Sequence, residues 1–184
     1  MCKLLFIALI VPYLVETRSP LPDATDENFQ KECNIEHNKY RSLHENTPTV
    51  KISQELIKHA KKRLSTITTF EKLDYIRNGN AKIFAPYGEN VFRGHNDKKR
   101  TTCAFALKSW YKGREIYSKP IYTSKTGQFT QIVWVKSIEV GCARSMSKPG
   151  AELEVYIVCS YNPPGNSKDD FAENVMKNKP KTSI

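Results

Sequence analysis

The stretch Gly127-Gln128-Phe129-Thr130-Gln131-Ile132-Val133-Trp134 carries the strongest fold signal in this chain of 184 residues. A glycine, which permits a turn, is followed by side chains that alternate with a period of two, the pattern of a β-strand. Large apolar side chains occur at both sets of alternating positions, so we expect both faces of the strand to be covered by layers of helices. Composition alone predicts a core strand without chemistry.

Three further blocks accompany Gly127–Trp134. They are His37-Asn38-Lys39-Tyr40-Arg41, Gly88-Glu89-Asn90-Val91 and Val158-Cys159-Ser160-Tyr161-Asn162-Pro163-Pro164-Gly165-Asn166. Together the four blocks resemble the CAP superfamily, which contains cysteine-rich secretory proteins, antigen 5 allergens, pathogenesis-related proteins and venom allergen-like proteins. Gly127–Trp134 is similar to the family's G-H-F-T-Q-hydrophobic-hydrophobic-W signature. The resemblance implies an α+β fold, a three-layer α-β-α sandwich. We expect a central three-stranded antiparallel sheet within it.

The chain divides into four parts. Residues 1–19 have one lysine before a short apolar run and are interpreted as a signal peptide, with cleavage between 17 and 20. A flexible leader over 20–26 precedes the CAP domain at 27–178, and 179–184 form a basic tail. No second apolar run follows, so we expect no transmembrane segment and a secreted, extracellular protein.

Apolar periodicity and capping residues place the elements of this domain. Helices are expected to begin after Asp26, after Ser53 and after Thr101 or Thr102, where a polar side chain can cap the first turn. Residues 65–80 have no clean period and are interpreted as a loop-rich connection. The remaining expected elements are strands at 127–134, 138–144 and 153–161, with a hairpin turn at 147–150, and a last helix at 169–177 that buries Phe171 and Val175.

Cysteine usage agrees with secretion. Removal of the signal peptide discards Cys2 and leaves four cysteines, which allow three disulfide pairings. Cys142 and Cys159 lie in neighbouring expected strands, so we pair them, and the resemblance implies the same bond. Cys33 is then left to pair with Cys103. A zinc site is disfavoured because no two cysteines have Cys-x-x-Cys spacing.

The formal net charge of +10 has two interpretations. A basic secreted protein can be drawn to anionic lipids, sulfated glycans or nucleic acid. Because the lysines are spread along the whole sequence, we favour simple solubility and expect no nucleic-acid partner. The only clusters are Lys58, Lys61, Lys62 and Arg63, which are expected to face water on the second helix, and Asp97-Lys98-Lys99-Arg100.

The resemblance implies a cleft in which two histidines and two acidic residues bind a divalent metal, and this chain departs from that pattern. Gln128 replaces the signature histidine, no histidine occurs between His59 and His95, and Gly113 stands where the second acidic residue is usual. Glu89 and Gln128 are therefore interpreted as remnants of the cleft. We expect no metal, no cofactor and no enzyme activity, because no serine or cysteine has a recognisable base beside it.

Two conspicuous polar residues receive structural interpretations. We expect Glu89 to be a buried carboxylate that accepts hydrogen bonds from the strand and turn around it. His37 lies on the apolar face of the first helix with Phe29, Cys33 and Tyr40. A buried histidine bonded to a neighbour is more common there than a catalytic one.

Binding is the remaining function. Several CAP proteins are lipid carriers, and the resemblance implies an aromatic sterol loop and an apolar fatty-acid channel between helices. Phe84, Tyr87 and Phe92 suit the loop, although they could equally fill the domain core. The sequence predicts a secreted carrier of sterols or fatty acids. The alternative is a ligand or antagonist of a protein receptor, as venom allergen-like proteins are thought to be, and a metal-dependent hydrolase is disfavoured.

Overall fold

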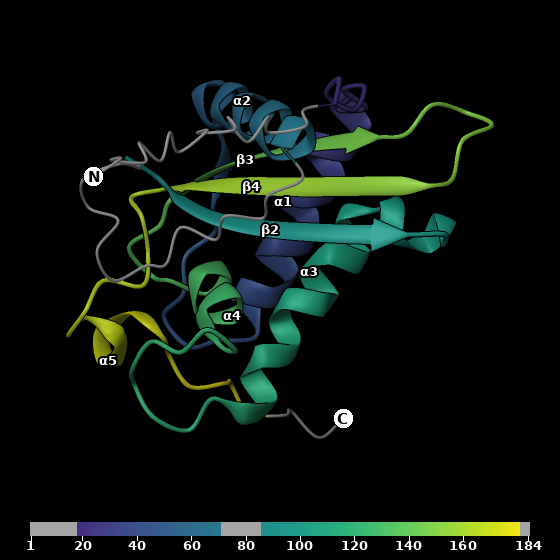
Figure 1. Cartoon of the computed structure of the whole chain (residues 1–184). Coiled ribbons are helices and arrows are strands. Elements are labelled where there is room, and N and C mark those ends of the chain that lie inside the picture. Colours follow the sequence, from purple (N-terminus) through teal and green to yellow (C-terminus); the bar gives the residue numbers. More distant parts are fainter. Residues whose placement is uncertain (1–17, 71–85, 181–184) are drawn as a thin grey trace, which may run out of the picture.

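The computed structural model describes residues 18–70 and 86–180, which form an α+β sandwich of three layers (Figure 1). Helix α2 (Gln54–Phe70) covers one face of a sheet. Helices α1 (Glu27–Ser42), α3 (Cys103–Tyr111) and α4 (Gly127–Ile132) cover the other face. The expected three-layer architecture is confirmed. Residues 1–17 of the proposed signal peptide, Phe84 and residues 181–184 of the basic tail lie outside the described ranges.

The sheet has four strands, in the spatial order β1 (Lys51–Ile52), β3 (Glu139–Met146), β4 (Glu154–Asn162) and β2 (Gly88–His95). Strands β2, β4 and β3 are antiparallel, with Gly88 opposite Tyr161 in β4, whereas the short β1 lies parallel to β3. Three antiparallel strands are therefore present as expected, but β2 takes the place that the sequence assigned to residues 127–134, and β1 was not expected.

The prediction of a strand at 127–134 was wrong, because this stretch forms helix α4. Its backbone makes helical hydrogen bonds, from Thr130 N to Thr126 O at 3.0 Å and from Val133 N to Phe129 O at 3.3 Å. Five of the six helical residues are buried. A helix enclosed on every side has no water-facing stripe, so its sequence lacks the period that would distinguish it from a strand.

All three predicted helix starts agree with the structure, and α2 begins at Gln54, directly after Ser53. The Asp26 carboxylate accepts a hydrogen bond from Phe29 N at 2.8 Å, and the Thr102 hydroxyl accepts one from Phe105 N at 3.2 Å. Helix α2 continues to Phe70, so the loop predicted from residue 65 was wrong over its first turns. Ile67, 1% exposed, extends the buried row of this helix.

The last helix is shorter than expected. Helix α5 covers only Phe171–Asn174, and the predicted extension to residue 177 was wrong. The main-chain carbonyl of Asn174 accepts a hydrogen bond from Val135 N at 3.0 Å, and its side chain accepts one from Lys136 N at 3.1 Å. These bonds to the segment that follows α4 take the place of a further helical turn. Two short 3-10 helices flank α3, at Lys98–Thr101 and Lys112–Ile116.

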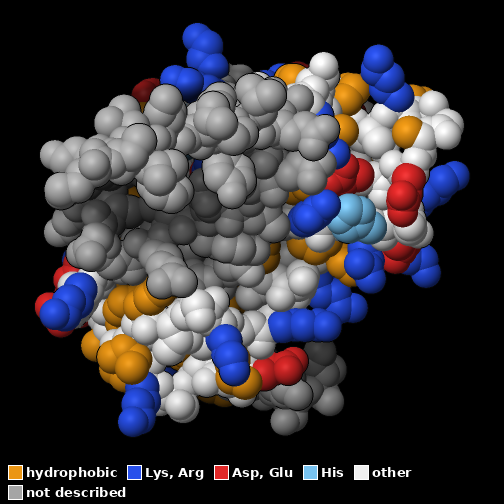
Figure 2. All heavy atoms as spheres, viewed as in Figure 1, with side chains coloured by type: hydrophobic (Ala, Val, Ile, Leu, Met, Phe, Trp, Pro, Cys, Tyr) orange, Lys and Arg blue, Asp and Glu red, His pale blue; other side chains and the backbone are white. Residues whose placement is uncertain are grey.

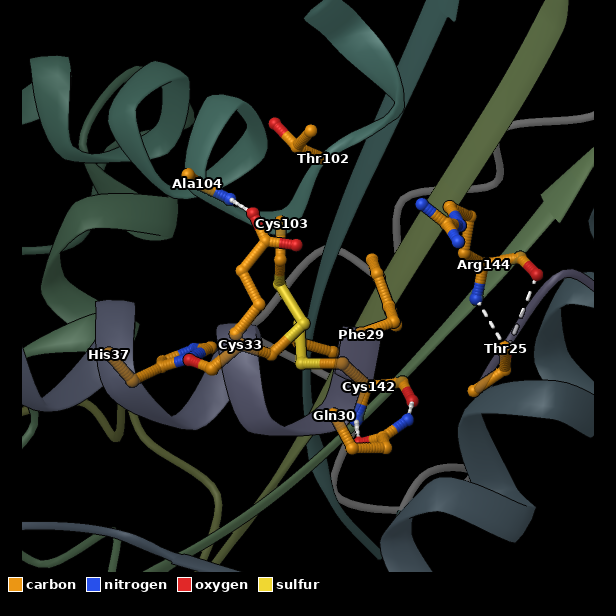
Figure 3. Close-up of a disulfide and its surroundings, with 12 residues drawn as sticks. Thr25, Phe29, Gln30, Cys33, His37, Thr102, Cys103, Ala104, Cys142 and Arg144 are labelled. Carbon is orange, nitrogen blue, oxygen red and sulfur yellow. Dashed lines mark hydrogen bonds between the residues drawn. A yellow bond between two sulfur atoms is a disulfide. The ribbon is translucent and has the colours of Figure 1, made fainter. Parts of the chain in front are cut away.

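Both predicted disulfides are present. Cys142 and Cys159 are directly opposite in β3 and β4, and Cys33 joins α1 to Cys103 at the start of α3. Figure 3 shows the second bond between the two helices, with Cys142 of the sheet beside it. All four sulfur atoms lie within 4.8 Å of one another, so the bond within the helix layer packs directly on the bond within the sheet.

The expected leader lies along the edge of β3. Ala24 N donates to Arg144 O at 2.8 Å, and Met146 N donates to Pro22 O at 3.1 Å. The Thr25 hydroxyl accepts a hydrogen bond from Arg144 N, as Figure 3 shows. These contacts join the leader to the domain. Within the described residues no helix has the length and apolarity needed to cross a bilayer.

Candidate functional site

The signature blocks, far apart in the sequence, contact one another beside α4. The Gln131 amide accepts a hydrogen bond from Gly165 N at 2.9 Å and donates to the Ser137 hydroxyl at 3.1 Å. Thr130 donates to the Asn166 side chain, which in turn donates to the carbonyl of Gly127 at 2.8 Å. These buried bonds join α4 to the segment after β4, so the two longest blocks hold the fold together.

His37 is buried and bonded through both ring nitrogens. Nδ1 is 2.7 Å from the carbonyl oxygen of Cys33, and Nε2 is 2.9 Å from the Tyr161 hydroxyl. Burial lowers the pKa of the His37 imidazole to about 4, so the ring is neutral at physiological pH. The interpretation of His37 as a structural histidine is confirmed.

Arg41, in the same block, is completely buried. Its guanidinium donates to four main-chain carbonyls, those of Pro48, Ile132, Trp134 and Ser137. Burial lowers the pKa of this side chain to about 10. The arginine is therefore the connector between α1, the loop before β1, and the end of α4.

Gln128, which stands where the family signature has histidine, caps the edge of the sheet. Its side-chain amide donates a hydrogen bond to the main-chain carbonyl of Val91 at 2.9 Å. The main-chain carbonyl of Gln128 accepts one from the Asn90 side chain at 3.0 Å. The Trp110 indole donates to the same Val91 carbonyl at 3.2 Å. Since β2 is an edge strand, these donors satisfy a carbonyl that no further strand reaches.

Glu89 is nearly buried and paired with a helix. Both carboxylate oxygens lie 3.1 Å from Nε of Arg63 on α2, and the two side chains are 8% and 16% exposed. Burial raises the pKa of the Glu89 carboxyl, and the Arg63 charge opposes this shift. The expected partners, the surrounding strand and turn, were wrong. The expectation that Arg63 faces water was wrong as well.

Glu89 and Gln128 therefore do not meet in one cleft. Glu89 points to α2, whereas Gln128 bonds with the neighbouring Asn90 on the α4 side, because successive strand residues alternate between faces. Among residues 18–70 and 86–180, the only group of three or more side chains placed to hold a metal ion is the four disulfide-bonded cysteines.

The proposed sterol-loop residues are also separated. The Tyr87 hydroxyl donates to Glu55 on α2, and its ring meets that of His59 edge-on at 4.9 Å. The Phe92 ring instead contacts Phe105 of α3 at 5.7 Å. The structure thus brings Tyr87 to the α2 layer and Phe92 to the α3 layer.

One serine does have a base beside it, contrary to the sequence expectation. Nδ1 of His59 lies 2.9 Å from the Ser160 hydroxyl. Burial lowers the pKa of His59, which favours a neutral ring. Ser160 is completely buried in β4 opposite Glu89, so its oxygen has no room for a substrate. The contact is best explained as packing of α2 on the sheet.

A depression of about 350 Å³ opens between the outer sides of α1 and α3. Its apolar surface comes from Tyr40, Ala104 and Phe105, and the Tyr40 ring stacks on Tyr111 at 4.2 Å. Its polar lining residues are Glu36, Lys39, Lys99, Thr102 and Lys108.

The sequence analysis did not identify this depression. Three lysines and one glutamate give it a net positive charge, and Glu36 pairs with Lys39 at 3.1 Å. Of its three lysines, only Lys99 belongs to a charge cluster noted in the sequence, the one at 97–100. The α1 and α3 contributions come from residues separated by more than 60 positions, which no local pattern connects.

The protein is therefore a disulfide-linked α-β-α sandwich in which the residues of the four sequence blocks bond to one another and to the main chain, and so stabilise the fold. The chain belongs to the cysteine-rich secretory protein (CAP) family, whose sequence profile matches residues 35–161. Nothing in the comparisons with known proteins points to an enzyme.

Curated relatives come from fungi, plants and animals. Protein PRY2 of Saccharomyces cerevisiae is 35% identical over 145 residues, which are 77% of this chain and 39% of PRY2. Pathogenesis-related protein 1A1 of Solanum lycopersicum is 35% identical over 102 residues, covering 52% of this chain and 53% of the relative. Glioma pathogenesis-related protein 1 of Mus musculus is 30% identical, covering 82% and 58%. The chain spans less than two thirds of the length of each.

Solved structures share the fold at lower identity. BmVAL-1 has a TM-score of 0.60 and 19% identity, with 79% of this chain and 81% of that chain covered. Venom allergen-like protein 4 of Schistosoma mansoni has a TM-score of 0.55 and 22% identity, covering 85% and 97%. At this identity the likeness concerns the fold alone.

Proposed function

We propose that this protein is a secreted, non-catalytic carrier of fatty acids. The observation that carries the proposal is the depression between α1 and α3, in which an aromatic floor lies beside three lysines. Secretion is supported by the apolar amino terminus and by two disulfides, which persist in oxidising compartments.

The lining suits an amphiphile with one negative charge. Tyr40 and Phe105 offer flat apolar surface to an acyl chain, and lysine ammonium groups can pair with a carboxylate. Lys39 is partly engaged by Glu36, so Lys99 and Lys108 are the better partners for the ligand. The volume falls in the range of small-molecule sites, roughly 300 to 1,000 Å³.

Sterol binding is the second form of the lipid proposal, and Tyr87 is the described residue that would take part. The separation of Tyr87 from Phe92 argues against one platform made by both rings. A sterol site would therefore use Tyr87 on the α2 side, independently of the α1–α3 depression.

The test is saturable binding of radiolabelled palmitate and cholesterol to the oxidised, full-length protein. Lys99→Glu with Lys108→Glu should weaken palmitate binding by about tenfold or more, because both changes place carboxylates beside the ligand's own charge. Cholesterol binding should be unchanged. Lys58→Glu, an exposed lysine on α2, is the control and should bind palmitate like wild type.

Each outcome bears on the proposal. Loss of palmitate binding in the double variant alone would support the α1–α3 site. Equal palmitate binding by all three proteins, or no saturable palmitate binding by wild type, would refute it. Cholesterol binding that is lost in Tyr87→Ala, without palmitate binding, would move the carrier function to the α2 side.

A further inference from the structure

We propose that the end of the molecule formed by residues 112–125 and 177–179 docks on the surface of an anionic lipid bilayer. These two segments are called the basal surface below. Figure 2 shows apolar and cationic side chains gathered at the lower left, where the connection between α3 and α4 lies in Figure 1. The proposal extends the carrier function to the membrane from which a lipid would be collected, but its test does not depend on that function.

Large apolar side chains are concentrated on this connection. Ile116 and Ile121 are 57% and 54% exposed, and Tyr122 is 36% exposed. Three of the seven exposed large hydrophobic residues of the described chain thus fall within seven positions. Single exposed apolar residues are ordinary, but a local group of them marks an interaction site.

Cations surround these apolar residues. The segment 112–125 has one acidic residue, Glu115, and four exposed cationic residues, namely Lys112, Arg114, Lys119 and Lys125. Charge of this kind attracts phosphatidylserine and other anionic headgroups. At the interface of a membrane, cationic side chains can pair with headgroups while neighbouring apolar side chains reach the acyl boundary.

His44 links the segment 177–179 to the segment 112–125. The two ring nitrogens of His44 contact the Tyr111 hydroxyl at 2.8 Å and the carbonyl of Met176 at 2.7 Å. Residue 177 therefore follows directly beside the start of the 112–125 connection. Lys177 and Lys179 are exposed there and add two positive charges to the basal surface.

The connection is fixed to the body of the domain at two points, so it presents its side chains without first being ordered. A Cβ on Gly113 would lie 3.0 Å from the Cβ of Phe129 in α4 and 2.9 Å from the carbonyl oxygen of Lys125, so this end of the segment packs closely on α4 and on the other end. The Tyr122 ring covers Gly127 at the start of α4, where an added Cβ would lie 2.5 Å from it. A preorganised surface loses less entropy on binding.

Bilayer chemistry explains both features of the basal surface, whereas a sulfated glycan explains only one. A glycan would pair with the cations and leave Ile116 and Ile121 in water. A bilayer takes the cations at its headgroups and the isoleucines at the acyl boundary. The α3 residues that line the depression run from Ala104 to Lys108, and the basal surface begins at Lys112, about 6 Å further along the chain at the helical rise.

The test is sedimentation of the oxidised protein with vesicles of phosphatidylcholine alone and of phosphatidylcholine mixed with phosphatidylserine. Wild type should bind the mixed vesicles, and bind the neutral ones at least about tenfold more weakly. Ile116→Asp with Ile121→Asp should reduce binding to the mixed vesicles by about tenfold or more. Ile35→Asp, at a 64% exposed isoleucine on α1, is the matched control and should bind like wild type.

Three results would overturn the proposal. The first is no preference of wild type for the mixed vesicles, and the second is equal loss in the Ile35→Asp control. The third is unchanged binding of the double isoleucine variant, which would indicate adsorption by charge alone, as to a glycan. Palmitate binding by the double variant, measured without vesicles, should equal that of wild type. This readout separates failure of membrane docking from failure of the carrier function.

Discussion

Removal of the Arg41 guanidinium is the sharpest test of how the signature blocks hold this fold. Arg41→Met keeps most of the side-chain volume but removes every donor. The four carbonyls that the side chain now reaches, at 2.6 Å for Pro48 and 2.9 Å for Ile132, Trp134 and Ser137, would lose that partner.

The magnitude follows from two opposing effects. A buried polar group left unsatisfied costs about 1 to 3 kcal/mol. The Trp134 carbonyl keeps its hydrogen bond from Ser137 N at 3.1 Å, so the cost for the other three carbonyls amounts to roughly 3 to 9 kcal/mol. Arg41→Met also removes a buried charge whose desolvation disfavours folding by several kcal/mol. We therefore expect the free energy of unfolding to fall by about 4 kcal/mol, a large part of the total stability of a typical domain.

The assay is urea unfolding followed by the fluorescence of the two buried tryptophans, Trp110 and Trp134. Arg41→Lys, which keeps the charge but lacks the planar fork of donors, should lose about 2 kcal/mol or more and remains measurable if the methionine variant does not fold. Arg100→Met, at a half-exposed arginine paired with Asp97, should change stability by only about 0.5 kcal/mol. A loss below about 1 kcal/mol in Arg41→Met would refute the reasoning.

Two further predictions concern packing and pH. Gly141→Ala should lower the melting temperature by about 5 to 10 °C, because the new Cβ would lie 2.2 Å from Ile57 N and 2.5 Å from the carbonyl carbon of Leu56 in α2; an unchanged melting temperature would mean that α2 can move away cheaply. The pKa of His37 is lowered from 6.5 to about 4, so the unfolded chain binds the proton first as the pH falls, and stability decreases between these values by about 3 kcal/mol. His37→Gln should flatten this part of the curve of unfolding free energy against pH, and parallel curves for variant and wild type would show that His37 is not the group responsible.

Local signals were sufficient for much of the fold. The caps at Asp26 and Thr102 and the apolar stripes behind them located α1 and α3 because capping and periodicity involve neighbours a few residues away. The hairpin of β3 and β4 and its disulfide were predictable for the same reason, since Cys142 and Cys159 are 17 residues apart. The buried role of His37 followed from its place on the α1 stripe.

Local signals failed where a segment is enclosed on every side. Residues 127–132 alternate like a strand but form a helix, because tertiary contacts cover all of its faces and the polar stripe is missing. In such a short apolar stretch, the periodicity of the side chains cannot distinguish a helix from a strand. The short β1 was unrecognisable because two residues carry no period at all.

The sequence by itself determined the family, the layer order and the cysteine pairing of this protein, because these depend on motifs, caps and neighbouring strands. Only the tertiary structure decided that Glu89 pairs with Arg63 on one face of the sheet while Gln128 caps Val91 at its edge. It also decided that an open depression with three lysines in its lining lies between α1 and α3, and that Lys177 lies beside the α3–α4 connection. Each of these contacts joins residues that are 26 or more positions apart, and the packing of whole elements, which no short window of sequence contains, brings them together.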